Sequence, residues 1–162
     1  VNAANVKLSG NKITFKADTT AIQVNAANVV IKDSQFTSTD VGTAAQNTFA
    51  IEVAGANAAI LNSKFDLSSV QNGAAAISVF VNAVNNATIK GNKILVSGFG
   101  SGVGISVITS PGPGPTNIVQ DNEIRATVDN QGIGIKGATK IINDALNGNS
   151  FPQPPALNIK VQ

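Results

Sequence analysis

The sequence predicts an all-β fold: a parallel β-helix, or solenoid, of about six coils with three short strands per coil, forming one domain over residues 1–162. A nine-residue phrase recurs six times, at intervals of 23 to 30 residues. Apolar residues alternate within the copies, and a further apolar strand follows each copy in the same order. A repeat of this length is typical of solenoids, in which each unit buries its apolar face only against its neighbours.

The first strand of each coil is expected at the start of the phrase. In the first two copies the alternating apolar residues are Val6 and Leu8, then Val29 and Ile31. Alternation with a period of two predicts a strand that buries one face. The copies span residues 5–13, 28–36, 57–65, 86–94, 116–124 and 143–151.

A two-residue corner interrupts each copy of the phrase. Its first residue is Gly, Asp or Asn, types that tolerate a left-handed backbone and therefore allow a sharp turn. Its second residue is Asn or Ser, and we expect these side chains to form a hydrogen-bonded ladder along the axis. The corners are Gly10-Asn11, Asp33-Ser34, Asn62-Ser63, Gly91-Asn92, Asp121-Asn122 and Gly148-Asn149.

Two further strands complete each coil. The second is expected at residues 13–15, 36–37, 65–67, 94–96 and 124–126, and the third at 21–24, 50–53, 76–79, 104–107, 134–136 and 158–161. Equivalent residues would stack at the sheet spacing of ~4.8 Å. The expected interior ladders are Leu8, Ile31, Ile60, Ile89, Val119 and Leu146, and Ile13, Phe36, Phe65, Ile94, Ile124 and Phe151. An antiparallel sandwich is the alternative, but it does not explain why three strands repeat in phase.

Composition excludes several functions. The chain has no Cys and no His, so it lacks thiolate chemistry and the commonest general base and metal ligand. The formal charge of +2 is spread out, with neither a basic run nor an aromatic platform, so no nucleic acid partner is expected. No apolar stretch is long enough to span a bilayer. We expect no cofactor and no metal.

The pattern Asn-x-x-Ile-x-x-Asn-x-Ile, followed by Gly/Ala-Ile-x-Val, resembles the right-handed parallel β-helix repeat of the pectin-lyase-like superfamily over nearly the whole chain. The resemblance implies a fold shared by polysaccharide lyases and hydrolases, phage tailspikes, adhesins and surface-layer modules. Enzymes of these kinds use clustered carboxylates, or Lys or Arg bases near calcium. Their acidic-triplet and Gly-His-Gly signatures are missing here, and no catalytic residue is assigned.

The outward positions of the expected strands form slots that repeat from coil to coil. Three slots emerge: Lys12, Gln35, Lys64, Lys93, Glu123 and Ser150; Thr14, Thr37, Asp66, Leu95, Arg125 and Pro152; and Gln23, Glu52, Ser78, Ser106, Lys136 and Lys160. No slot places two carboxylates on successive coils, as a stacked catalytic pair would require.

Two groups of outward residues are weak binding candidates. Lys12, Lys64 and Lys93, flanked by Arg125, form a basic stripe that would attract acidic polysaccharide, or else form a solvated face that prevents sideways strand pairing. Asp40, Glu52 and Asp66 could lie near one another around the second and third coils, as a calcium or catalytic cluster.

The function expected from these features is that of a non-enzymatic structural module in an extracellular or cell-surface assembly. The alternatives are a polysaccharide-binding adhesin or tailspike-like module, and a fragment related to polysaccharide lyases or hydrolases. Residues 1–5 repeat residues 24–28, and residues 159–162 resemble residues 22–25. The chain is therefore expected to be either a piece of a longer β-helix or a protomer that stacks head to tail into filaments.

Overall fold

The computed structural model describes residues 1–43, 46–70, 75–96, 101–108, 117–126, 131–136, 149 and 157–161. Throughout these residues the regular structure is β-strand, and no helix is present. In this part of the chain there is consequently no helical segment suited to crossing a membrane.

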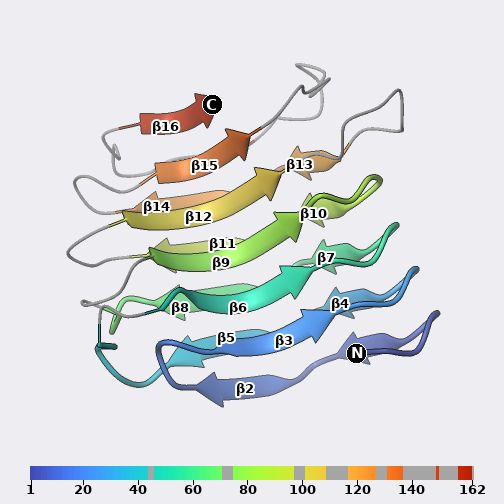
Figure 1. Ribbon diagram of the computed structural model, residues 1–162, viewed down its shortest axis with the longest axis horizontal. Coiled ribbons are helices and arrows are strands. Elements are labelled where there is room, and N and C mark those ends of the chain that lie inside the picture. Colours follow the sequence, from blue (N-terminus) through green and yellow to red (C-terminus); the bar gives the residue numbers. More distant parts are fainter. Residues whose placement is uncertain are drawn as a thin grey trace.

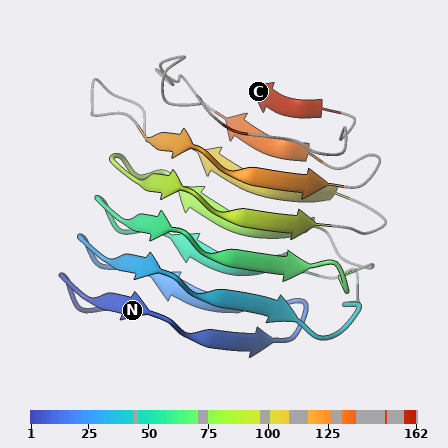
Figure 2. The ribbon, with the colours of Figure 1, turned by 180° about the vertical axis from the view of Figure 1, so that it is seen from behind.

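Three parallel sheets form the sides of a coiled stack, and each coil contributes one strand to each sheet (Figure 1, Figure 2). Sheet A contains β1 (Lys7–Ser9), β4 (Val30–Lys32), β7 (Ala59–Leu61), β10 (Thr88–Lys90) and β13 (Ile118–Gln120). Sheet B contains β2 (Lys12–Phe15), β5 (Gln35–Ser38), β8 (Lys64–Leu67), β11 (Lys93–Val96) and β14 (Glu123–Ala126). Sheet C contains β3 (Thr20–Val24), β6 (Thr48–Val53), β9 (Ala75–Asn82), β12 (Ser101–Ile108), β15 (Gln131–Lys136) and β16 (Leu157–Val161).

This arrangement confirms the predicted parallel solenoid with three strands per coil. Five coils have all three strands within the described residues, and β16 belongs to a sixth. The sixth copy of the phrase, with its predicted ladder residues Leu146 and Phe151, lies outside the described residues apart from Asn149.

The interior ladders are confirmed by the strand register. In sheet A, Leu8 pairs with Ile31, and the ladder continues through Ile60, Ile89 and Val119. In sheet B the ladder is Ile13, Phe36, Phe65, Ile94 and Ile124. The rings of Phe36 and Phe65 stack with centroids 4.9 Å apart. From the second coil onward these ladder residues are buried, and they form the core of the rod.

The two-residue corners between sheets A and B also have the predicted conformation. Their first residues adopt positive φ: Gly10, Asp33, Asn62, Gly91 and Asp121. At Gly91 a Cβ atom would come within 2.4 Å of Asn62 Oδ1, so any larger residue there would require the Asn62 side chain to move.

The second corner residues form the predicted polar ladder. From Ser34 onward, each side-chain oxygen accepts a hydrogen bond from the backbone N–H of the equivalent residue one coil earlier, as in Ser63 N to Asn92 Oδ1 at 2.9 Å. Asn92 Nδ2 donates to the carbonyl of Ile60 at 3.0 Å and to Asn122 Oδ1 at 2.9 Å. Asn122 in turn donates from its backbone and side chain to Asn149 Oδ1. The buried corner backbone is thereby satisfied, as burial of polar groups requires.

A second asparagine ladder lies on the exposed corner where sheet C leads into sheet A. Asn5, Asn28, Asn57 and Asn86 all have φ near +60°. The amide of Asn57 donates to Asn28 Oδ1 at 3.0 Å, and that of Asn28 donates to Asn5 Oδ1 at 3.1 Å. This explains why five of the six copies of the phrase begin with Asn.

The predicted alignment of the third strands is wrong at two coils. Glu52 and Ser106 both pair with Phe80 rather than with Ser78, and Ser106 pairs with Gly134 rather than with Lys136. In a regularly alternating strand a shift of two residues keeps each side chain on its face, so alternation alone cannot detect it.

The predicted outward position of Ser78 is also wrong, since Ser78 is buried. It lies opposite Ala50, where alternation is interrupted because Ala50 and the next residue, Ile51, are both buried.

The first coil is more open than the coils that follow. Leu8, Ile13 and Ile22 are only partly buried. The residues that stack on them in the second coil, Ile31, Phe36 and Ile51, are completely buried. Within the described residues, β1, β2 and β3 are each the terminal strand of their sheet.

Candidate functional site on the outer face of sheet B

The outer face of sheet B presents two rows of side chains that run across the strands. Strand pairing confirms the two predicted slots over five coils: Lys12, Gln35, Lys64, Lys93 and Glu123 in one row, and Thr14, Thr37, Asp66, Leu95 and Arg125 in the other. The two rows lie on one face because alternate residues of a strand point to the same side. The predicted sixth members, Ser150 and Pro152, lie outside the described residues.

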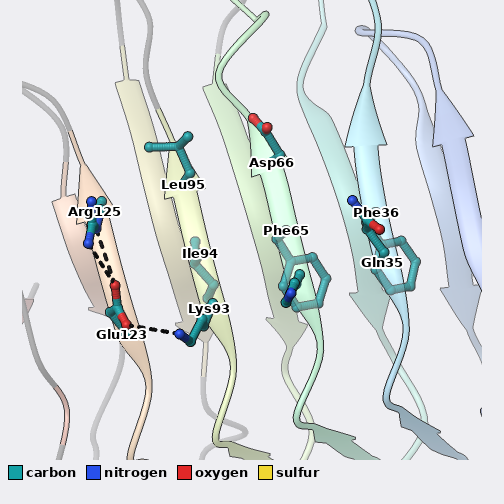
Figure 3. A pocket seen from close by; sticks show the side chains of 10 residues that line it. Gln35, Phe36, Phe65, Asp66, Lys93, Ile94, Leu95, Glu123 and Arg125 are labelled. Atoms are coloured by element: carbon teal, nitrogen blue, oxygen red, sulfur yellow. Dashed lines mark hydrogen bonds and ion pairs between the residues drawn. The ribbon is translucent and has the colours of Figure 1, made fainter. Parts of the chain in front are cut away.

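A shallow hollow of about 240 Å³ lies on this face, across β5, β8, β11 and β14 (Figure 3). It brings together four of the predicted candidates: Lys64, Asp66, Lys93 and Arg125. The other residues that line it are Gln35, Phe36, Phe65, Ile94, Leu95 and Glu123. Since its walls come from four successive coils, the site exists only when the coils are stacked.

The centre of the charged network is Glu123. Its carboxylate lies 3.6 Å from Lys93 Nζ and 3.2 Å from Arg125 Nη2, and Figure 3 shows it between these two cations. Arg125 Nε also donates to Glu123 Oε1 at 3.2 Å. The side chains of Lys93 and Arg125 remain 67% and 53% exposed. Ion pairs this exposed contribute only about 0.2–1 kcal/mol each, so either cation can turn to another anion at small cost.

Lys64 adds a third cation beside this network. It pairs in register with Lys93 on the neighbouring strand, and like charges placed directly opposite destabilise a sheet. Among the described residues, Lys64 has no ion pair. An anion bound between the two ammonium groups would relieve this repulsion.

The opposite side of the hollow carries hydrogen-bonding and apolar groups. Asp66 accepts hydrogen bonds from the backbone N–H and the hydroxyl of Ser68, which holds its carboxylate in place. Leu95, in register with Asp66, is 36% exposed and gives the site an apolar patch. The hollow therefore combines cations, fixed acceptors and a small apolar surface.

The remaining predicted residues lie elsewhere. Lys12 is in the row of Lys64 but two strands away, and it does not line the hollow. Asp40 follows β5 and accepts a hydrogen bond from the backbone N–H of Ala17. Glu52 lies on sheet C, where it accepts from Gln23 Nε2 at 3.4 Å and Asn82 Nδ2 at 3.2 Å.

The suggested acidic cluster of Asp40, Glu52 and Asp66 is therefore not formed. The three carboxylates belong to different segments and make separate local contacts. No group of three or more Asp or Glu residues in the described part of the chain could hold a metal ion.

Three outward-facing residues of the lining are not among the candidates predicted from the sequence, although all of them occupy the predicted slots. Gln35 and Glu123 interrupt the row of lysines, and Leu95 is an uncharged residue of the neighbouring row. A pattern of repeated charge therefore does not indicate them. The signal that could have found Glu123 is its spacing from Arg125, because residues two apart on a strand share a face.

An ion pair on the neighbouring corner differs from those in the hollow. Lys32 Nζ lies 2.9 Å from Asp33 Oδ2, and this hydrogen bond lowers the pKa of Asp33 below its ordinary value. Ser9 contributes a further hydrogen bond. Asp33 thus stays ionised down to a more acidic pH, and its charge continues to neutralise that of Lys32 at this corner.

Comparison with protein-family models, with curated proteins and with solved structures finds no match to this chain. The interpretation of the hollow therefore rests on its geometry.

Proposed function

We propose that this chain is a non-enzymatic structural module of an extracellular or cell-surface assembly, and that the outer face of sheet B attaches it to acidic polysaccharide. The observation that carries the proposal is the convergence of Lys64, Lys93 and Arg125 around one exposed hollow. Membership of the pectin-lyase-like superfamily is part of the proposal. It is supported by the parallel coils and by the asparagine ladder at the short corner.

The mixture of groups in the hollow favours an acidic sugar over other anions. Cations attract the carboxylate or sulfate of such a ligand, while Asp66 and Gln35 provide hydrogen-bond partners for hydroxyl groups. Leu95 offers contact to the apolar face of a sugar ring. A polyphosphate has no hydroxyl groups along its chain to donate to Asp66, so it would gain nothing from this carboxylate. Equivalent side chains on this face repeat every ~4.8 Å along the rod axis, because that is the spacing of neighbouring strands. A regular spacing of this kind suits a linear polymer that lies along the axis.

Binding to polygalacturonate, measured by isothermal titration calorimetry at low salt, tests this proposal, with neutral dextran as the comparison polymer. We expect polygalacturonate to bind more weakly as salt rises, because exposed charges are screened. Replacing Lys64 or Lys93 with Ala should weaken binding roughly two- to fivefold, because an exposed ion pair contributes no more than about 1 kcal/mol.

The matched control is Lys90→Ala, which removes the same charge from sheet A, where Lys90 pairs with Asp121. If all three variants lost the same affinity for polygalacturonate, the effect would come from net charge alone, and the hollow would be rejected as the binding site. Turnover of polygalacturonate or alginate with calcium would reject the non-enzymatic part of the proposal.

A second candidate function, end-to-end stacking into filaments, is favoured by the open first coil. Unpaired strand edges with partly buried apolar residues are a template for another strand layer. All strands of sheet C are parallel, so β16 of a second copy could lie against β3 in the same direction, with Ile159 level with Ile22. Within one chain, Val1 already lies against the end of β3: its ammonium group donates to the carbonyl of Gln23, and its carbonyl accepts from the backbone N–H of Asn25. Strand pairing between two copies along β3 would therefore end at Gln23.

A further inference from the structure

We propose that Glu123 is a built-in competitor for the anionic group of the ligand, so that an acidic sugar binds by displacing the Glu123 carboxylate from Lys93 and Arg125. This inference rests on the proposed function of the hollow and names the residue that regulates its affinity. It starts from the position of an internal anion between the two cations that a ligand would need.

The geometry places one carboxylate on two cations from two successive coils. Glu123 reaches Lys93 on β11 at 3.6 Å and Arg125 on β14 at 3.2 Å. A ligand carboxylate that bound both groups would need the same position. Binding must therefore either displace Glu123 or leave the two cations engaged with it.

Displacement is feasible because Glu123 is held only at the surface. Its side chain is 31% exposed and its partners are more exposed still. Among the described residues, its recorded side-chain partners are these two cations alone. Rotation of the glutamate side chain would free both cations without moving the backbone. By contrast, Asp66 is held by two hydrogen bonds from Ser68 and has no cation partner among the described residues.

The arrangement predicts a preference for polymers over single sugars. A monomeric uronate has one carboxylate, so it can only replace the ion pairs of Glu123 with similar ion pairs of its own. A polymer that is already held at Lys64 delivers its next carboxylate at high effective concentration, which offsets the competition. Glu123 would thus act as a filter for ligand length.

The test is the affinity of the Glu123→Gln variant for polygalacturonate and for monomeric galacturonate, measured by calorimetry at one salt concentration. Glutamine keeps the length of the side chain but loses the charge. We expect the affinity for polygalacturonate to rise roughly three- to tenfold, because two weak ion pairs no longer compete. The gain for the monomer should be larger, so that discrimination by length falls.

The matched control is Asp66→Asn, which makes the same change of charge in the same hollow but frees no cation. The amount by which Glu123→Gln raises the affinity for polygalacturonate beyond the change caused by Asp66→Asn measures the displacement of Glu123. This difference should vanish in a background in which Lys93 and Arg125 are both replaced by Gln. Thermal denaturation checks that each variant is folded.

The outcomes separate the inference from the proposed function. If the wild-type protein binds and Glu123→Gln binds no better than Asp66→Asn, the competitor role is rejected while the site stands. Weaker binding by Glu123→Gln would mean that Glu123 instead holds the two cations in position for the ligand, which also rejects it. If neither the wild type nor Glu123→Gln binds, both the inference and the proposed function fail.

Discussion

At the scale of single residues, the fold depends on where small polar residues permit a left-handed backbone and where branched apolar residues fill the rod. Asp33, Asn62 and Asp121 adopt positive φ without being glycine. Asp and Asn tolerate this region better than other residues with side chains, because their short polar groups bond locally. Between such corners, Ile31, Ile60 and Ile89 stack in one buried column.

Truncation of a ladder residue should cost far more stability than truncation of a residue on the outer face. Ile60 is 1% exposed in the middle of its column, so Ile60→Ala should lower the free energy of unfolding by about 2–5 kcal/mol through lost burial and a residual cavity. Lys64→Ala, four residues along, should change it by no more than about 0.5 kcal/mol. Urea titrations of both variants check this, and equal losses would show that the assignment of inside and outside is incorrect.

At the scale of the element, the corner ladder joins neighbouring coils through side-chain hydrogen bonds as well as strand pairing. Asn92 is buried and satisfies the backbone N–H of Ser63 and the carbonyl of Ile60. In the two preceding coils a serine fills the same position, and Ser63 Oγ accepts from the backbone N–H of Ser34 at 3.2 Å. Two residue types therefore perform one structural role at this corner.

This equivalence makes a prediction about substitutions at Asn92. Asn92→Ala would leave buried polar groups without partners, at a cost of about 1–3 kcal/mol for each. Asn92→Ser should cost distinctly less, because a hydroxyl can still accept the hydrogen bond from Ser63 N–H. Denaturation midpoints of the two variants give the comparison. A serine variant no more stable than the alanine variant would contradict the hydrogen-bonding role of the ladder.

At the scale of the whole molecule, the rod presents a charged side face and an open first coil. These features correspond to the two candidate functions, polysaccharide attachment and stacking. Contact between the first coil of one copy and the last coil of another is heterologous, so it does not close on itself and would build filaments.

Stacking predicts association that rises with protein concentration. Leu8 is a partly buried ladder residue on the first coil, and Leu8→Lys would place a charge in the contact between copies and abolish the association. Lys64→Ala, on the side face, should leave association unchanged. Sedimentation velocity over a wide concentration range measures both. A wild-type protein that sediments as a monomer at the highest concentration rejects stacking for this chain.

The sequence by itself determined the coil plan of this protein. It predicted the three strands, the interior columns of sheets A and B, and the left-handed corners with their polar ladder. These features are local: period-two alternation separates inside from outside, and Gly, Asp and Asn mark the turns. It also predicted both rows of the outer face of sheet B, and with them the positions of Lys64, Lys93 and Arg125.

Only the tertiary structure decided the register of sheet C and the electrostatic partners in the hollow. Phe80, not Ser78, lies opposite Glu52. The pattern could not show this, because a strand shifted by two residues buries the same face. That Glu123 bridges Lys93 and Arg125 depends on the paths of long side chains across stacked coils. Those paths follow from packing in three dimensions, which no local repeat encodes.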